Sequence, residues 1–352
     1  MWPSKGEGSP PEQAALWQGG ISVLPCILGA VISVALIRSG FLSFFFLIPL
    51  GFVAAVYNGR TAWAAALSAL GINTFISLCL SLAGGGKAGE FALDFFYFAL
   101  MIGTFVWIMA PPALGPQFLR IRTAYRFVAA SAAGALMFMG IVYASNRGNS
   151  GFMVFLRAQA EMLSSLYIAS AGADAVQQSF LERQVTPDNI IALMGFVAQR
   201  GGAVASSMAM FYISRQLACS LAVLTRHVQP KPGLREFHAP SRLIWALSFS
   251  LPAILLFRVL KLGLPEIAAW NMLVLCAMMY LAQGGGIIRF FLARRDISPF
   301  LRLVSNILII VVIFSPGINA FALGAVILLG IAENWAPLRA PKPNGPPSTP
   351  AV

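Results

Sequence analysis

Long apolar runs alternate with short polar connections along most of the 352-residue chain. A helix needs about 20 largely apolar residues to cross the hydrocarbon core of a bilayer. Runs that come near this length predict helices over residues 18–37, 41–57, 62–82, 91–110, 127–144, 190–224, 243–260, 265–288, 299–314 and 318–331. The last two runs are short, and a partial hairpin there would leave about eight full spans. We therefore predict an all-α fold, a polytopic transmembrane bundle of about 8–10 membrane helices.

The stretch 264–296 sets the direction of this bundle. Its apolar run begins near Ile267 and continues through Gln283 and three glycines to Ile288. Arg289, Arg294 and Arg295 follow within two helical turns. An apolar run followed by a basic cluster is typical of a helix that leaves the membrane on the cytoplasmic side.

Lysines and arginines near the other span ends give a consistent orientation, because cytoplasmic loops carry an excess of them. Alternate connections carry most of these residues, namely Arg60, then Arg120, Arg122 and Arg126, then Arg226, Lys231, Arg235 and Arg242, then Arg289, Arg294, Arg295 and Arg302. The intervening short connections hold fewer. Both termini are therefore predicted to be cytoplasmic.

This topology divides the chain into five parts. A polar cytoplasmic tail (1–16), which lacks the pattern of a cleaved signal peptide, precedes a five-helix membrane bundle (17–144). An outward loop (145–189) follows, then a second membrane bundle (190–335) and a Pro-rich tail (336–352) that we expect to be disordered.

The outward loop is too long for a simple turn. Phe155, Met162 and Leu166 recur near helical spacing, which predicts an amphipathic helix at the outer membrane interface. A packed lid without a ligand is the alternative. Thr186 followed by Pro187 is typical of a helix start, and the run from Pro187 to Leu224 predicts one continuous helix of about 57 Å.

Composition supports a membrane protein. The chain is 58% hydrophobic and 10% charged, whereas soluble domains carry about 25% charged residues. The net charge of +12 comes from small groups of basic residues between the apolar runs. This distribution is typical of the loops of a membrane protein and not of a nucleic-acid-binding surface, so no nucleic-acid partner is predicted. The four cysteines lie inside apolar runs without a CxxC or histidine partner, so neither a disulfide framework nor a metal site is expected.

Polar side chains at membrane depth are the candidate ligand-binding residues, because burying them is costly. The deep and outward ones form a candidate substrate pocket: Asn73, Asp94, Tyr97, Gln199, Arg200, Glu266 and Asn271. Arg200 is the central cation of this set, and Asp94 is its predicted acidic partner.

Three of these residues also have a simpler interpretation. Arg200 and Arg215 share a helical face and could each reach one membrane interface. Asp94 could stabilise the first turn of its helix, because a negative charge there interacts favourably with the helix dipole. Asn73 could bond a neighbouring helix.

Gln283, Gly284, Gly285 and Gly286 lie apart from this pocket. Gln283 falls about 26 Å beyond Glu266 along one helix, near the cytoplasmic surface. We therefore predict a helix-packing or partner contact for them. Small-residue spacing from Gly29 to Ser33 and from Ala130 to Gly134 also favours close helix packing.

Catalytic constellations are missing from the sequence. The two histidines, His227 and His238, fall in one predicted cytoplasmic connection, so an intramembrane Ser-His or zinc hydrolase is not expected. The run SLAGGGKA at 81–88 lacks the first glycine and the final hydroxyl of a nucleotide loop. We predict no enzymatic activity and no cofactor.

Several motifs resemble a known family. They are FFLIPLGFVAAVYNGR at 45–60, Leu251-Pro252, the run from Leu281-Ala282-Gln283-Gly284 to Ile288-Arg289-Phe290-Phe291-Leu292, and Gly330-Ile331-Ala332-Glu333-Asn334-Trp335 with Arg339. Over about residues 20–340 the chain resembles the YybS-like family of predicted bacterial membrane proteins, a domain of unknown function. It departs from the family pattern at Ala336-Pro337, where an aromatic and an acidic residue are usual.

That family is distantly similar to the substrate-binding membrane subunits of energy-coupling-factor transporters. The resemblance implies a multi-pass protein of the bacterial inner membrane, a substrate-capturing component of an uptake transporter that works with separate ATPase and coupling membrane subunits. The alternative is a membrane structural or assembly factor whose cytoplasmic basic loops bind protein partners or anionic lipid.

Overall fold

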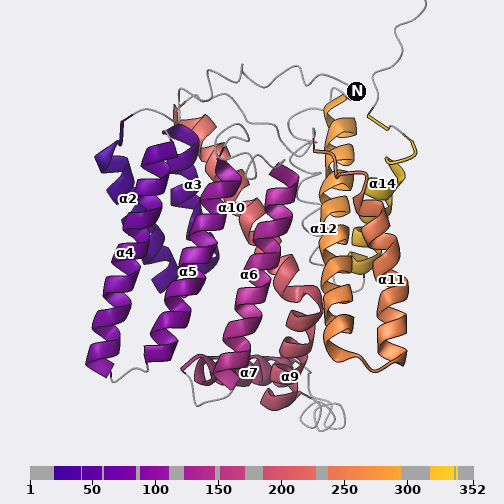
Figure 1. Cartoon of the computed structure of the whole chain (residues 1–352), viewed down its shortest axis with the longest axis horizontal. Helices are drawn as coiled ribbons and strands as arrows, with labels where there is room; N and C mark the ends of the chain where they lie inside the picture. Colours follow the sequence, from indigo (N-terminus) through magenta and orange to yellow (C-terminus); the bar gives the residue numbers. More distant parts are fainter. Residues whose placement is uncertain are drawn as a thin grey trace, which may run out of the picture. The chain divides into compact units, whose positions relative to one another are not determined.

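The structure, a computed structural model, describes residues 20–40, 42–57, 59–84, 88–110, 123–146, 151–170, 185–226, 237–294, 318–336 and 338–339. Every regular element in these ranges is a helix, which confirms the all-α prediction (Figure 1). The helices are α2 (Val23–Arg38), η1 (Ser43–Phe45), α3 (Leu47–Val56), α4 (Gly59–Gly84), α5 (Ala88–Met109), α6 (Thr123–Asn146), α7 (Gly151–Ser170), α9 (Pro187–Val197), η3 (Ala198–Gly202), α10 (Ala203–Arg226), α11 (Leu243–Val259), α12 (Gly263–Arg294) and α14 (Ile318–Ala332). The helix predicted over 299–314 and the Pro-rich tail beyond Arg339 lie outside the described residues.

Three helical segments in the described ranges are long and apolar enough to cross a membrane: Gly59–Leu82, Pro187–Thr225 and Gly263–Arg294. Shorter apolar helices accompany them, among them α2, α11 and most of α5. The helical fold is therefore compatible with a membrane protein.

The chain forms two compact units. Unit 1 contains Met1–Pro230 and Leu262–Asn271, and unit 2 contains Lys231–Lys261 and Met272–Val352. The predicted boundary was different, because it assigned residues 190–224 to the second bundle. In the structure α10 packs against α3 and α6, and it therefore belongs to unit 1.

Helix α3 is the centre of unit 1. It packs against α2, α4, α5 and α10, and its residues Leu47, Leu50 and Ala54 are buried. A Cβ on Gly51 would lie 2.8 Å from the Cβ of Ala218, so glycine is what allows α10 to approach this closely.

The small residues of α2 and α6 also pack inside unit 1. A Cβ on Gly29 would meet Val53 of α3 at 2.8 Å, and a Cβ on Gly134 would meet Ser207 of α10 at 3.2 Å. Ser33 Oγ donates a 2.6 Å hydrogen bond to the carbonyl oxygen of Phe46. These positions therefore serve contacts between helices of this chain.

Arg126 joins α6 to the end of α5. Its guanidinium Nη1 donates to the carbonyl oxygens of Trp107 at 2.9 Å and Ala110 at 2.6 Å, and it lies 5.6 Å from the Trp107 ring centroid. The sequence interpretation counted Arg126 among cytoplasmic loop cations, but the side chain is fully buried. A cation at this position satisfies the last carbonyls of α5 and complements the helix dipole.

Helix α7 lies across the lower ends of other unit 1 helices in Figure 1 and packs against α9. A helix was predicted in this connection, and Met162 and Leu166 on it are exposed. The side chain of Phe155 lies outside the described residues. The predicted start of the next helix is confirmed, because the Thr186 hydroxyl accepts a 3.2 Å hydrogen bond from Asn189 N and Pro187 follows it.

Unit 2 is held by a close contact between α12 and α14. A Cβ on Gly284 would overlap the carbonyl oxygen of Val326, and a Cβ on Gly330 would overlap that of Tyr280. Gly284 and Gly286 are buried, and Gly285 is half-buried. The glycines after Gln283 thus lie in helix α12, and Gly284 allows two backbones to touch.

Candidate functional site

The long helix predicted from Pro187 to Leu224 is broken, so the prediction of one continuous helix was wrong. α9 and α10 are joined by the π-helical turn Ala198–Gly202. Arg200 (φ −96°, ψ 34°) and Gly201 (φ 112°, ψ −12°) leave helical geometry there. Such a positive φ is strained for residues with a side chain and readily adopted by glycine. The Gly201-Gly202 pair is therefore the local cause of the break, and the shared helical face predicted for Arg200 and Arg215 is lost.

The break positions Arg200 against an aromatic ring and an acid. Its guanidinium carbon lies 3.9 Å from the ring centroid of Phe196, within range of a cation–π contact. Arg200 Nη2 lies 3.4 Å from Glu266 Oε1 at the start of α12, and the two side chains are 25% and 15% exposed. Among the described residues the acidic partner of Arg200 is therefore Glu266. The side chain of Asp94, the predicted partner, lies outside the described residues.

Asn271, just over one helical turn after Glu266, completes the cluster. Its Nδ2 donates to the carbonyl oxygen of Gln199 at 2.6 Å and to that of Ile267 at 2.8 Å. Its Oδ1 is buried and accepts no hydrogen bond from the described residues. A buried acceptor without a donor costs about 1–3 kcal/mol, so this atom has unused binding capacity.

We call Gln199, Arg200, Glu266 and Asn271 the break cluster. It combines a cation, a carboxylate, a main-chain carbonyl at the helix break and an amide oxygen without a donor. π-helical turns occur frequently at functional sites, and interrupted membrane helices often form the substrate and ion sites of transporters. The arrangement thus offers one cation for a carboxylate and one free acceptor for a hydrogen-bond donor.

The remaining predicted pocket residues do not belong to this cluster. Asn73 Oδ1 accepts a 3.0 Å hydrogen bond from Arg38 Nε, and Arg38 Nη2 also donates to Ser77 Oγ. Asn73 therefore joins α4 to α2, the simpler interpretation. Tyr97 is half-buried and packs against the hydrophobic core of unit 1.

A second polar cluster lies inside unit 2. Gln283 Oε1 accepts from Ala239 N at 2.7 Å, and Gln283 Nε2 donates to Gly330 O and Glu333 Oε2 at 3.0 Å each. Arg339 binds Glu333 through Nε at 2.6 Å and Nη2 at 2.5 Å, and also donates to Phe237 O at 2.9 Å. We call Gln283, Glu333 and Arg339 the tail network.

The tail network was missed as a unit by sequence reasoning, although its three residues all belong to the motifs that carry the family resemblance. The contact could not be predicted because Gln283 is far from the other two residues along the chain. Arg339, which follows the departure from the family pattern at Ala336-Pro337, reaches Glu333 in the structure.

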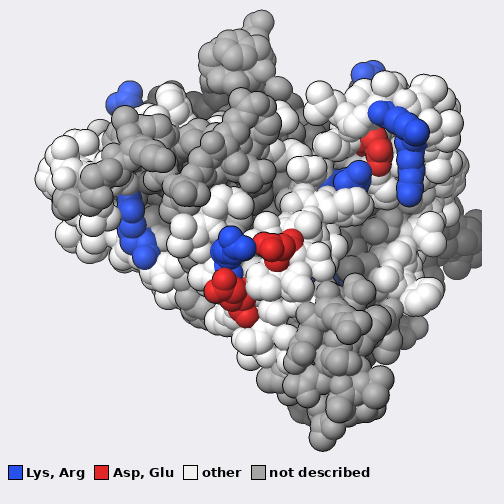
Figure 2. Space-filling model, turned by 90° about the horizontal axis from the view of Figure 1, so that it is seen from below, with Lys and Arg blue, Asp and Glu red and all other residues white. Residues whose placement is uncertain are grey.

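Charged groups are sparse among the described residues on the face that Figure 2 shows. Figure 2 shows one face on which a few acidic and basic side chains lie among residues that are mostly uncharged. Within the described ranges, no three His, Cys, Asp or Glu side chains gather closely enough to hold a metal ion.

Comparison of the chain with protein-family models, curated proteins and solved structures found no match. The resemblance to the YybS-like family therefore stays a prediction.

Proposed function

We propose that this chain is a multi-pass protein of the bacterial inner membrane that captures a small solute for uptake. The proposed arrangement has about 8–10 membrane helices with both termini in the cytoplasm. It is supported by the three helical segments of spanning length and by the alternation of basic connections along the sequence.

The observation that carries the proposal is the break cluster. Among the described residues, Arg200 uses a guanidinium N–H for one hydrogen bond, to Glu266, whereas an arginine carries five such donors. The 3.4 Å separation is longer than the 2.7–2.9 Å of a strong charge-assisted bond. A solute carboxylate could therefore form two parallel bonds with Arg200 and displace Glu266.

The same geometry favours a second polar group on the solute. Displacement would free the Glu266 carboxylate, and Asn271 Oδ1 already lacks a donor among the described residues. An ammonium, amide or hydroxyl group would satisfy both acceptors. The proposed substrate class is therefore a small carboxylate that also carries a hydrogen-bond donor.

Energy for uptake would come from other proteins. The sequence contains no nucleotide-binding loop, and the family resemblance suggests separate ATPase and coupling membrane subunits. In this proposal the chain performs binding and no bond chemistry.

Purification from native membranes in mild detergent tests the proposal, with mass spectrometry of co-purifying small molecules and subunits. We expect a small carboxylate and an ATPase-type partner with the wild type. Arg200→Gln should lose the small molecule, whereas Arg258→Gln, which changes an exposed arginine of α11, should retain it. Size-exclusion elution checks that each variant is folded.

If neither a ligand nor an ATPase-type partner co-purified with the wild type, the uptake proposal would be refuted. Recovery of other membrane proteins without a ligand would favour the assembly factor instead.

A further inference from the structure

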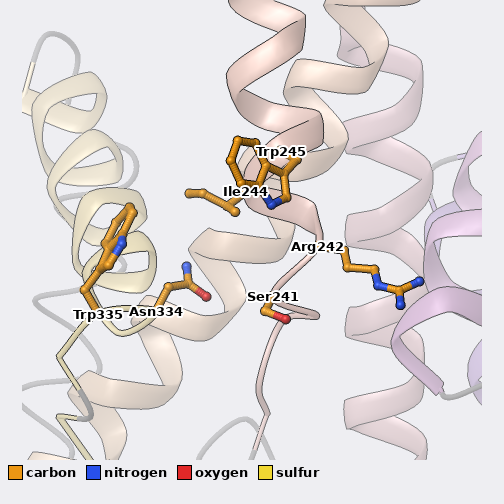
Figure 3. Close-up of a pocket in the computed structure, with 6 residues that line it drawn as sticks. All are labelled: Ser241, Arg242, Ile244, Trp245, Asn334 and Trp335. Atoms are coloured by element: carbon orange, nitrogen blue, oxygen red, sulfur yellow. The ribbon is translucent and has the colours of Figure 1, made fainter.

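A surface pocket in unit 2 has a composition suited to the membrane interface. Its volume is 260 Å³, and its lining residues are Ser241, Arg242, Ile244, Trp245, Asn334 and Trp335. In Figure 3 Ile244 and Trp245 belong to the first turn of α11, Ser241 and Arg242 come just before it, and Asn334 and Trp335 stand opposite, after α14. The pocket therefore has one wall from each of two chain segments.

The tail network holds both walls. Ala239, two residues before Ser241, is bonded to Gln283. Glu333, immediately before Asn334, is bonded to Gln283 and Arg339. The Ala239 bond is buried, and the partly buried bonds of Glu333 are charge-assisted, so both walls are held in place before any ligand arrives.

Two exposed tryptophans flank the pocket. The exposed fractions are 66% for Trp245 and 72% for Trp335. Tryptophan is enriched where membrane helices meet the lipid head groups. Arg242 is also exposed and forms no ion pair with the acids in the described ranges. Figure 3 shows its side chain directed away from Asn334 and Trp335, so the guanidinium reaches the pocket by a side-chain rotation, which its exposure allows.

Apolar stripes continue from both walls. On α11, exposed residues recur at i, i+4, i+7 and i+11: Trp245, Phe249, Pro252 and Leu256. On α14 the exposed Ala332, Leu328, Ala325 and Phe321 follow the same spacing. Residues at these intervals lie on one face of a helix, so each wall leads into an apolar track.

We infer that this pocket binds one anionic phospholipid. Arg242 and the Ser241 hydroxyl bind the phosphate, the tryptophans flank the glycerol region, and the acyl chains follow the apolar tracks of α11 and α14. A phospholipid fits both the cation and the apolar tracks, whereas free phosphate would leave the tracks uncovered. This inference concerns unit 2 and is independent of the proposed uptake function.

Native mass spectrometry of the delipidated full-length chain tests the inference. The protein is titrated with phosphatidylglycerol, phosphatidylcholine or glycerol phosphate. We expect one phosphatidylglycerol to bind at least tenfold more tightly than phosphatidylcholine, and glycerol phosphate not to bind at the same concentrations. Loss of one charge-assisted contact should weaken binding by about tenfold in Arg242→Gln.

Arg289→Gln is the matched control, since Arg289 is an exposed arginine of α12 outside the pocket. Its phosphatidylglycerol affinity should equal that of the wild type. Trp335→Ala should weaken the binding of both phospholipids by the same factor. Equal binding of the two phospholipids, equal loss in both arginine variants, or saturable binding of glycerol phosphate would each overturn the inference.

Discussion

The break cluster and the tail network are both polar groups in a largely apolar chain, but they differ in how completely their atoms are paired. In the tail network the Glu333 and Arg339 side chains are 5% and 6% exposed and meet at 2.5 Å. In the break cluster the Arg200 to Glu266 distance is 3.4 Å, and Asn271 Oδ1 has no donor among the described residues. One cluster is closed, and the other keeps spare hydrogen-bonding capacity.

In the proposed function, this difference separates the structural role of the tail network from the binding role of the break cluster. A buried polar network in which each group has a partner makes a unique structure rigid. A strained backbone and an unsatisfied acceptor persist where the surrounding structure maintains them, and they often mark functional sites. Polar residues at membrane depth therefore need to be judged by their partners as well as by their depth.

The largest effect is expected for Glu333→Ala. The substitution leaves the buried Arg339 guanidinium without its carboxylate, and we expect a stability loss of about 3–5 kcal/mol. Thermal unfolding followed by circular dichroism in detergent measures the loss. Glu161→Ala, on an exposed residue of α7, should change stability little. Equal melting of the two variants would contradict a structural role for the tail network.

Gly201→Ala should come next. The alanine Cβ is strained at φ 112°, which should cost about 1–3 kcal/mol. Gly195→Ala is the control within α9, because a Cβ there meets nothing within 4 Å, and it should be neutral or slightly stabilising. The same melting experiment compares them. If Gly201→Ala melted no lower than Gly195→Ala, the positive φ at residue 201 would not be required for the stability of the fold.

A smaller effect is expected in a double-mutant cycle on Arg200 and Glu266. Arg200→Gln and Glu266→Gln each leave a partly buried charge without its partner, whereas the double variant leaves neither. Because both side chains are partly exposed, the coupling should be about 1–2 kcal/mol. Strictly additive losses would show that the two side chains do not interact.

The smallest effect on stability is expected from cysteine labelling, which tests on which membrane side each cluster lies. In a variant without the four native cysteines, Leu262→Cys reports on the α12 end that carries Glu266, and Ser241→Cys on the segment bonded to Gln283. Both exposed positions should change stability by less than about 0.5 kcal/mol. A membrane-impermeant maleimide should label Leu262→Cys in intact cells. It should label Ser241→Cys only after the cells have been permeabilised. The reverse pattern would invert the proposed topology.

The sequence by itself determined the helices and the polar residues worth attention. Apolar runs of spanning length and the Thr186-Pro187 start located most helices, because bilayer thickness and capping act locally. Arg200, Glu266 and Asn271 were recognised as candidates because polar groups at membrane depth are costly.

The tertiary structure alone decided how these residues pair. The length of an apolar run predicts the length of a helix, but it does not predict a single residue with an unusual backbone conformation. The break at Gly201 was therefore missed. Depth along a helix says nothing about lateral neighbours, so Asp94 was chosen as the partner of Arg200 where the structure has Glu266. The tail network joins residues separated by 50 positions, as Gln283 and Glu333 are, because the packing of α12 against α14 brings them together.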